Sequence, residues 1–303
     1  MSLSGVVVPT LTPMDITGNK LNLDVLPQQV DFLVRYRVGA LFINGTTGEG
    51  ALLSTAERKE HAEQVISTVA KRIPVVVQIG VLSTRESIEL ADHAARVGAD
   101  AVACISPSFF AYGQAELEQH YLAVARAVSP LDFYLYNIPA RTGNTLSAQL
   151  AERLSQEDNI VGIKDSSGNL AQILDYLAVP NLDVLPGADL LATQALLAGA
   201  KGIVAGPAGV FPEPYMAFWD AWQAKDHAHL LYWQNILMQL SRLIAHGGRL
   251  DVLKALAALR LPGLGSVRSP LATIQVDELE HLRHTLKEVL SATHLSEEAY
   301  SWL

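Results

Sequence analysis

The chain has 303 residues, of which 50% are apolar and 17% are charged, so it can bury a large core. Its formal net charge of −9 has the wrong sign for a protein that neutralises phosphates, so we expect no nucleic-acid partner. No apolar run reaches the roughly 18 residues of a membrane-spanning helix, and no signal-peptide pattern opens the chain. We therefore expect a cytoplasmic protein without a membrane partner.

Short apolar runs rich in β-branched residues predict eight β-strands in the first two thirds of the chain. The runs begin near Gly5, Ala40, Pro74, Asp100, Phe133, Ile160, Leu182 and Gly202. Stretches with helical spacing separate them, as in residues 62–70 and 88–97. Capping-box patterns mark two helix starts, at Ser54 with Glu57 and at Ser83 with Glu86, and glycines stand where two helices should stop, at Gly39 and Gly98.

Strand and helix alternate eight times, which predicts an α/β fold of the (β/α)8 TIM barrel type. An open doubly wound sheet is disfavoured because the first turn, residues 9–13, lacks the glycines of a dinucleotide-binding loop. After about residue 225 only helical periodicity continues, so we expect a C-terminal helical extension. The predicted division is a catalytic barrel at residues 1–224 and a helical domain at residues 225–303, with residues 261–265 linking two of its helices.

The ends of the fifth and sixth predicted strands carry the residues best suited to catalysis, because a TIM barrel builds its active site at the C-terminal strand ends. These ends are Tyr136-Asn137 and Lys164-Asp165, and adjacent strands lie only about 4.8 Å apart. Lys164 and Gly162 share one face of their strand, and we expect this face to point into the barrel. Because Gly162 has no side chain, we expect open space below the lysine. Removal from water favours the neutral amine, which can attack a carbonyl carbon and form a Schiff base. Alternatively, Lys164 reaches solvent and pairs with Asp165.

Three loops that follow strands offer groups for binding an anion. Residues 45–50, Gly-Thr-Thr-Gly-Glu-Gly, can present backbone N–H groups and the hydroxyls of Thr46 and Thr47 to a carboxylate, although an ordinary turn explains them equally well. Arg141 suits bidentate binding of a second carboxylate or a phosphate, or else lies at the surface or in an interface. The glycines of residues 202–209 fit close backbone packing near a ligand better than a phosphate site.

The sequence gives little support for metal or redox chemistry. Two histidine pairs, His227 with His229 and His281 with His284, fall in the predicted helical extension, where we expect them to face solvent. No dinucleotide or P-loop pattern occurs. The single cysteine, Cys104, lies in an apolar run, and we expect it to behave as a small buried apolar residue.

Three segments resemble the signatures of the dihydrodipicolinate synthase and N-acetylneuraminate lyase family, in that family's order and spacing. They are residues 45–49 (GTTGE), 136–143 (YNIPARTG) and 162–165 (GIKD), and the resemblance covers nearly the whole chain. It implies a class I aldolase or lyase in which Lys164 forms an imine with pyruvate or another 2-keto acid. It also implies that Tyr136 relays protons, that no cofactor or metal takes part, that an aldehyde is the second substrate, and that the protein is a homotetramer.

The resemblance extends to the residues that line the pocket. Thr46 and Thr47 match the residues that hold the pyruvate carboxylate, and Gly187 and Val204 match positions that line the pyruvate pocket. The predicted catalytic residues are therefore Lys164, Tyr136 and Thr46, and the predicted substrate-binding residues are Thr47, Arg141, Gly187 and Val204.

One segment departs from the synthases of this family. Synthases usually have two adjacent tyrosines after the proline of the fourth strand, and here Ser108 and Phe109 stand in their places. Phe109 lacks the hydroxyl of the proton relay, and Tyr112 replaces it only if the loop takes another path. Ser108 likewise removes a tyrosine of the lysine-inhibition site, so we expect no feedback inhibition by lysine.

Three functions follow, and the sequence leaves them open. The first is an aldolase or lyase for a 2-keto-3-deoxy or 4-hydroxy-2-keto acid. The second is a true 4-hydroxy-tetrahydrodipicolinate synthase that condenses pyruvate with aspartate semialdehyde, which Arg141 favours because synthases keep this arginine for the semialdehyde's carboxylate. The third is a catalytically weak paralogue that only binds a keto acid.

Overall fold

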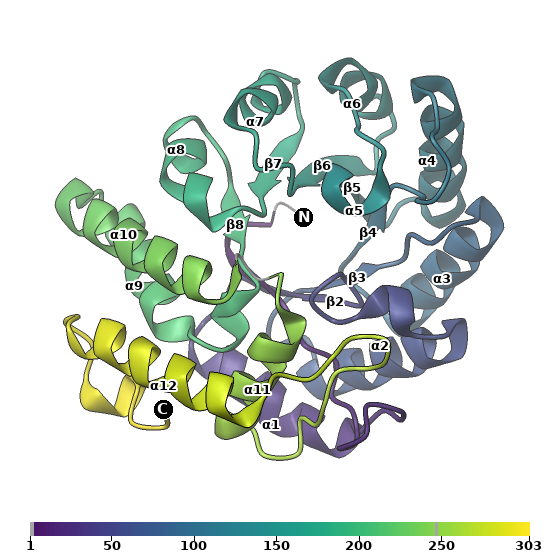
Figure 1. The fold of residues 1–303 in the computed structure, drawn as a ribbon. Coiled ribbons are helices and arrows are strands. Elements are labelled where there is room, and N and C mark those ends of the chain that lie inside the picture. Colours follow the sequence, from purple (N-terminus) through teal and green to yellow (C-terminus); the bar gives the residue numbers. More distant parts are fainter. Residues whose placement is uncertain (1–2, 246–247) are drawn as a thin grey trace.

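The computed structural model describes residues 3–245 and 248–303, and its centre is a barrel of parallel strands surrounded by helices (Figure 1). The strands are β1 (Gly5–Pro9), β2 (Ala40–Ile43), β3 (Val75–Gln78), β4 (Ala101–Ile105), β5 (Asp132–Asn137), β6 (Ile160–Asp165), β7 (Asp183–Pro186) and β8 (Gly202–Val204). Each begins within one residue of its predicted start.

The strands form one sheet in the order β7-β6-β5-β4-β3-β2-β1-β8. Every neighbouring pair is parallel, and β1 pairs with both β2 and β8. The gap between β7 and β8 is bridged by the backbone N–H of Lys201, which donates to the carbonyl of Val184 at 3.2 Å. The predicted (β/α)8 TIM barrel is therefore confirmed.

Alternation along the strands divides the apolar residues between two cores. Residues such as Val7, Phe42 and Tyr136 fill the inside of the barrel. Their neighbours in sequence, such as Val8 and Leu41, face outward and pack with the surrounding helices in a second, larger core. Cys104 is buried in this outer core, as predicted. This period of two decides which side chains reach the interior of the barrel.

Helices follow the strands, and most of them cover the outside of the barrel. They are α1 (Leu26–Arg35), α2 (Thr55–Val69), α3 (Thr84–Val97), α4 (Gln114–Val128), α5 (Pro139–Thr142), α6 (Ala148–Leu154), α7 (Leu170–Leu177), α8 (Ala192–Leu197), α9 (Pro212–Gln223), α10 (His227–Leu243), α11 (Leu250–Arg260) and α12 (Val276–Ser291). Short 3₁₀ turns lie at η1 (Leu23–Val25), η2 (Gly50–Leu52), η3 (Asp189–Leu191), η4 (Pro207–Gly209) and η6 (Glu297–Ala299).

The helix boundaries follow the predicted caps in most places. Ser54 and Glu57 form the complete capping box at the start of α2, and Gly98 ends α3 in a left-handed conformation. Ser83 accepts the expected bond from the backbone of Glu86, but the Glu86 carboxylate instead accepts a hydrogen bond from Thr55. Gly39 does not end a helix, because α1 already ends at Arg35. A β-carbon at Gly39 would lie 2.1 Å from the carbonyl oxygen of Ser4, so the glycine permits close approach of two backbones.

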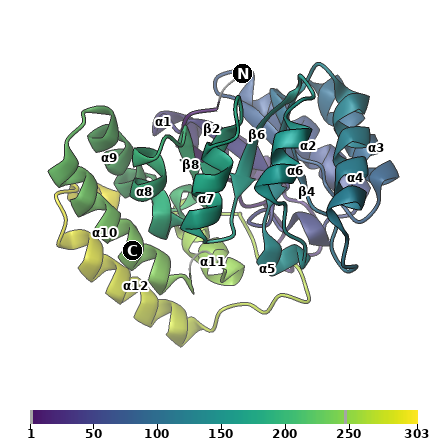
Figure 2. The ribbon, with the colours of Figure 1, turned by 90° about the horizontal axis from the view of Figure 1, so that it is seen from above.

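The C-terminal helices α10, α11 and α12 extend the barrel, as predicted (Figure 1). Figure 2 shows α11 at the same end of the barrel as α5, which follows β5 and therefore marks the C-terminal strand ends. The outer core continues from the barrel helices into α10, α11 and α12. The division at residue 224 stays a prediction.

The histidines of the extension face solvent as expected, because His227, His229, His281 and His284 are all exposed. Within residues 3–245 and 248–303, no group of three or more His, Cys, Asp or Glu side chains is arranged to hold a metal ion. None of the helices in this described part is both long and apolar enough to cross a membrane.

Candidate active site

Lys164 lies inside the mouth of the barrel. Its Cα is the register partner of the Tyr136 Cα, and its side chain is 5% exposed. The Lys164 Nζ stands 3.9 Å from the centre of the Tyr136 ring and 4.2 Å from that of Phe42. Asp165 points elsewhere, since its carboxylate accepts hydrogen bonds from Asn137 Nδ2 and from the Ser167 hydroxyl, both at 2.6 Å. The alternative of a solvent-exposed Lys164 paired with Asp165 is therefore wrong.

The space below Lys164 is filled rather than open. A β-carbon at Gly162 would lie 2.4 Å from Cε1 of Tyr134 and 2.8 Å from the carbonyl oxygen of Asp183. The prediction of open space at Gly162 was wrong, because the ring of Tyr134 from the neighbouring strand occupies it. Gly162 therefore permits this ring to pack beneath the lysine, inside the barrel.

Tyr136 is the second polar group beside Lys164. Its hydroxyl lies 3.3 Å from the hydroxyl of Thr46. Burial raises the pKa of Tyr136, but the positive charge of Lys164 and hydrogen bonds with Thr46, Lys164 and Ser166 together bring this pKa below its ordinary value. A phenol whose proton is released more easily is suited to passing a proton to and from a neighbouring group.

A cavity of about 340 Å³ opens at this end of the barrel. All seven residues that the sequence singles out line it: Thr46, Thr47, Tyr136, Arg141, Lys164, Gly187 and Val204. The loops after β2, β5, β7 and β8 thus meet around the lysine, as the strand-end rule predicts. Gly187 has a steric role, because a β-carbon there would lie 2.2 Å from the Ser166 hydroxyl. The assigned roles of these residues in binding and catalysis stay predictions.

Comparison with known proteins identifies the family. A sequence model described as the dihydrodipicolinate synthetase family matches residues 2–289. The chain belongs to this family. It is an enzyme of the class I aldolase and lyase type, which confirms the resemblance seen in the sequence.

Relatives from two kinds of comparison support this membership. An uncharacterized DapA-like lyase of Halobacterium salinarum is 32% identical over 292 residues, which are 95% of each chain. A 4-hydroxy-tetrahydrodipicolinate synthase of Citrifermentans bemidjiense is 32% identical over 94% of this chain and 98% of that synthase. The solved structure of YagE, a prophage protein of this family from E. coli K12 in complex with pyruvate, has a TM-score of 0.88 at 28% identity and covers 95% of this chain and 98% of YagE.

The cavity of this family member is also lined by polar residues that the sequence analysis missed. Ser166, Ser167, Asp189 and Ser241 line it. The two serines directly follow β6 and Asp189 follows β7, so the strand-end rule could have found them. Ser241 comes from α10 of the C-terminal extension, and no sequence signal indicates that this helix reaches the cavity.

Asp189 is held in place by the residues around it. Its Oδ2 accepts a hydrogen bond from the Tyr215 hydroxyl at 3.0 Å, and its backbone carbonyl accepts one from Gln234 Nε2 at 2.8 Å. Burial raises the pKa of Asp189 to about 6, although hydrogen bonds from Tyr215 and Ser241 act in the opposite direction. The cavity therefore contains a carboxyl group that changes charge close to neutral pH.

We expect Asp189→Asn to stabilise the protein more at pH 8 than at pH 5. The pKa of about 6 in the folded protein lies above the ordinary 3.8, so the stabilisation linked to the protonated carboxyl is complete below pH 3.8 and is lost as the pH rises through 6. Asparagine stays neutral, so the melting temperature of the variant minus that of the wild type should rise by on the order of 2 °C or more across this range. Thermal denaturation at both pH values measures it, and an unchanged difference would contradict the raised pKa.

The aromatic loop after β4 stands apart from the cavity. Phe109 is 86% exposed and has φ +79°, and the backbone N–H of Tyr112 donates to Asn144 Oδ1 at 2.9 Å. Neither residue lines the cavity. Within a single chain, Tyr112 therefore does not bring its hydroxyl to the cavity, and its role in a proton relay stays a prediction.

Proposed function

We propose that the enzyme forms a Schiff base between Lys164 and pyruvate, or a related 2-keto acid, and then makes or cleaves a carbon-carbon bond. The observation that carries the proposal is that the buried Lys164 lines the cavity together with Tyr136 and Thr46, whose hydroxyls lie close to each other. The YagE structure, which holds pyruvate, has the same fold over nearly the whole chain.

The chemistry follows from the groups in the cavity. Lys164 gives up its proton, and the free amine attacks the C2 carbonyl of the keto acid; return of a proton to the resulting hydroxyl lets it leave as water and gives a protonated imine. This imine withdraws electrons from C3, so either a C3 proton or an aldehyde carried on C3 can depart and leave an enamine. The enamine then takes up a proton or attacks an aldehyde, and hydrolysis of the imine frees the lysine. Tyr136 moves the protons, while Thr46 and Thr47 hold the keto-acid carboxylate.

We place a 2-keto-3-deoxy or 4-hydroxy-2-keto acid first as the substrate. Such substrates carry hydroxyls, and Ser167, Asp189 and Ser241 offer hydrogen-bonding groups around the cavity. Phe109 also lacks the relay hydroxyl of synthases. Arg141, which lines the cavity, favours the alternative of a 4-hydroxy-tetrahydrodipicolinate synthase, because it can bind the carboxylate of aspartate semialdehyde. If the enzyme turned over pyruvate with aspartate semialdehyde far faster than it cleaved any 2-keto acid, this alternative would be the correct one.

The imine itself is tested by incubating the wild type with pyruvate and sodium borohydride, followed by intact-protein mass spectrometry and peptide mapping. One pyruvyl group per chain, located on Lys164, is expected. An adduct on another lysine would refute the assignment. Absence of an adduct with pyruvate and with longer 2-keto acids would favour the catalytically weak paralogue.

We also propose that the enzyme is a homotetramer, that it works in the cytoplasm, and that its chemistry needs no external cofactor. The exposed Phe109 and Phe110 suit a subunit contact, because aromatic side chains are enriched in protein interfaces. A mass measurement in solution tests the tetramer.

A further inference from the structure

The loop of residues 45–50 has one side that faces the cavity and another that faces the C-terminal extension. Thr46 and Thr47 line the cavity. Glu49 does not line it, is buried and has a left-handed backbone with φ 56°. The two threonines and the glutamate belong to one tight turn, in which the N–H of Gly50 donates to the carbonyl of Gly45 at 3.0 Å. The N–H of Glu49 also donates to the carbonyl of Thr46 at 3.1 Å, so whatever holds Glu49 contributes to the position of the threonines.

Glu49 is held by two partners from the last fifth of the chain. Lys254 Nζ on α11 donates to Glu49 Oε1 at 2.6 Å, and the backbone N–H of Arg268 donates to Oε2 at 2.7 Å. The side chains of Lys254 and Glu49 are 1% and 0% exposed, so water cannot replace either partner. A buried carboxylate that loses its counter-charge is strongly destabilised. The place of Glu49 thus depends on Lys254.

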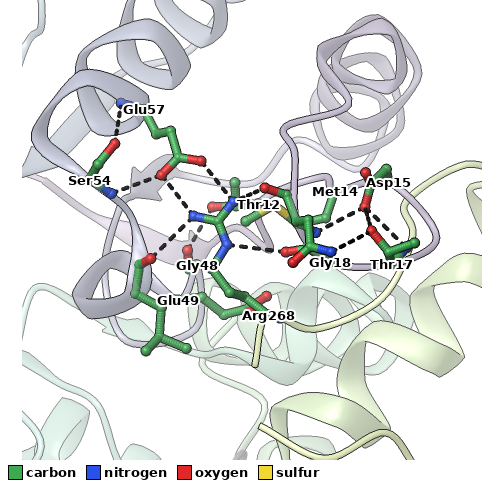
Figure 3. A network of polar contacts seen from close by, with 12 residues as sticks. Thr12, Met14, Asp15, Thr17, Gly18, Gly48, Glu49, Ser54, Glu57 and Arg268 are labelled. Atoms are coloured by element: carbon green, nitrogen blue, oxygen red, sulfur yellow. Dashed lines mark hydrogen bonds and ion pairs between the residues drawn. The ribbon is translucent and has the colours of Figure 1, made fainter. Parts of the chain in front are cut away.

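The segment that carries Arg268 is itself fixed. Figure 3 shows the Arg268 guanidinium between Glu57 and the turn that contains Gly18. Its Nη1 and Nη2 each lie 2.7 Å from an oxygen of Glu57, and its Nε donates to the Gly18 carbonyl at 3.1 Å. This bidentate pair connects the segment to the start of α2, so the N–H that reaches Glu49 has a defined position.

Other bonds hold the earlier part of the loop. The Thr12 hydroxyl donates to the carbonyl of Gly48 at 2.7 Å, which Figure 3 also shows. At the start of the loop, Asn44 Oδ1 lies 2.7 Å from His61 Nδ1, and Asn44 Nδ2 donates to the carbonyl of Arg58 at 2.9 Å. These contacts fix Asn44 and Gly48, while the end of the loop depends on Lys254 and Arg268.

We propose that Lys254 is a positioning residue for the keto-acid carboxylate, which it serves by holding Glu49 and, through it, Thr46 and Thr47. The inference rests on the proposed function of the two threonines. Because Thr46 also lies 3.3 Å from the Tyr136 hydroxyl, movement of the loop disturbs the proton-transferring group as well. Misplacement of binding groups by about 1 Å can cost on the order of a hundredfold in rate.

The test compares two variants of the same helix. Lys254→Met keeps the length of the side chain and removes its charge. Arg260→Met removes another largely buried ion pair of α11, in which Arg260 Nη2 lies 2.7 Å from Glu213 Oε1. This pair does not involve the loop of residues 45–50. In borohydride trapping at increasing pyruvate concentration, Lys254→Met should raise the half-saturating concentration about tenfold or more, and Arg260→Met by less than about twofold. Both are compared at equal folded fraction, checked by circular dichroism.

A rescue variant separates positioning from general damage. In Glu49→Gln combined with Lys254→Met both charges are gone, and the amide oxygen of the glutamine can still accept from the N–H of Arg268. The double variant should bind pyruvate better than Lys254→Met alone. Equal or worse binding would count against a role of Lys254 through Glu49.

Hydrogen exchange tests the loop without any substrate. Amide exchange in the peptide that contains residues 44–50 should be faster in Lys254→Met than in wild type and unchanged in Arg260→Met. Unchanged exchange in Lys254→Met, or equal effects of both variants on pyruvate binding, would overturn the proposal. A wild type that forms no adduct would instead refute the proposed function and with it the role in carboxylate binding, while the exchange result still decides whether Lys254 holds the loop.

Discussion

Lys164→Ala is expected to abolish turnover and to prevent formation of the borohydride-trapped adduct. The Lys164 amine is the nucleophile of the proposed imine, and loss of a covalent nucleophile typically lowers turnover by about 10⁴-fold or more. Its Nζ contacts the faces of Phe42 and Tyr136, so alanine leaves an apolar space and the barrel should stay folded. Steady-state kinetics of keto-acid cleavage and mass spectrometry of the trapped protein measure both effects.

Lys201→Ala is the matched control. Lys201 is exposed and directly precedes β8, at the end of the barrel away from the cavity, and only its backbone N–H contributes to closing the sheet. Turnover and adduct should stay within about twofold of the wild type. A trapped Lys164→Ala protein, or equal losses in both variants, would refute the role of Lys164.

Tyr136→Phe should lower kcat by about 10²- to 10⁴-fold, which is the usual contribution of a positioned proton-transfer group. The variant keeps the ring that stacks against Lys164 and removes the hydroxyl that meets Thr46. The adduct should still form, but more slowly, because the lysine and the cavity remain. Single-turnover kinetics of imine formation and of bond cleavage measure the two steps separately.

Tyr134→Phe provides the control for this substitution. Tyr134 lies two residues earlier on the same face of β5, and its hydroxyl accepts a hydrogen bond from the N–H of Leu3 at 3.1 Å. Burial raises the pKa of Tyr134 to about 12, and the residue does not line the cavity. We expect a loss of about 1 kcal/mol in the free energy of unfolding with kcat nearly unchanged. Similar losses of kcat in both variants would mean that the Tyr136 hydroxyl has no specific role in proton transfer.

Local patterns were enough to predict the barrel and the meeting of Lys164 with Tyr136. Strand starts follow from apolar runs, and the alternation of side chains places both residues on inward faces of paired strands. The strand-end rule then brings in Thr46, Thr47 and Arg141, and the family resemblance adds Gly187 and Val204; all five line the cavity.

Contacts between distant parts of the chain were not predicted. The ring of Tyr134 under Gly162, the approach of Ser241 on α10 to the cavity, and the Lys254–Glu49 pair each depend on how separate elements pack. No spacing within a strand or helix encodes such contacts. The raised pKa of Asp189 is similar, since it depends on burial by surrounding elements rather than on neighbouring sequence.

The pairing of Lys254 with Glu49 also has a consequence for how the enzyme is made. The two residues are 205 positions apart in the chain, so during synthesis the glutamate leaves the ribosome long before its lysine does. Contacts of such high sequence separation form late, because a long loop must close before they contribute. In a nascent barrel, the loop of residues 45–50 is therefore stabilised by Lys254 only after α11 has been synthesised. A chain that ends before α11 would contain Lys164 and Tyr136 but would lack this support.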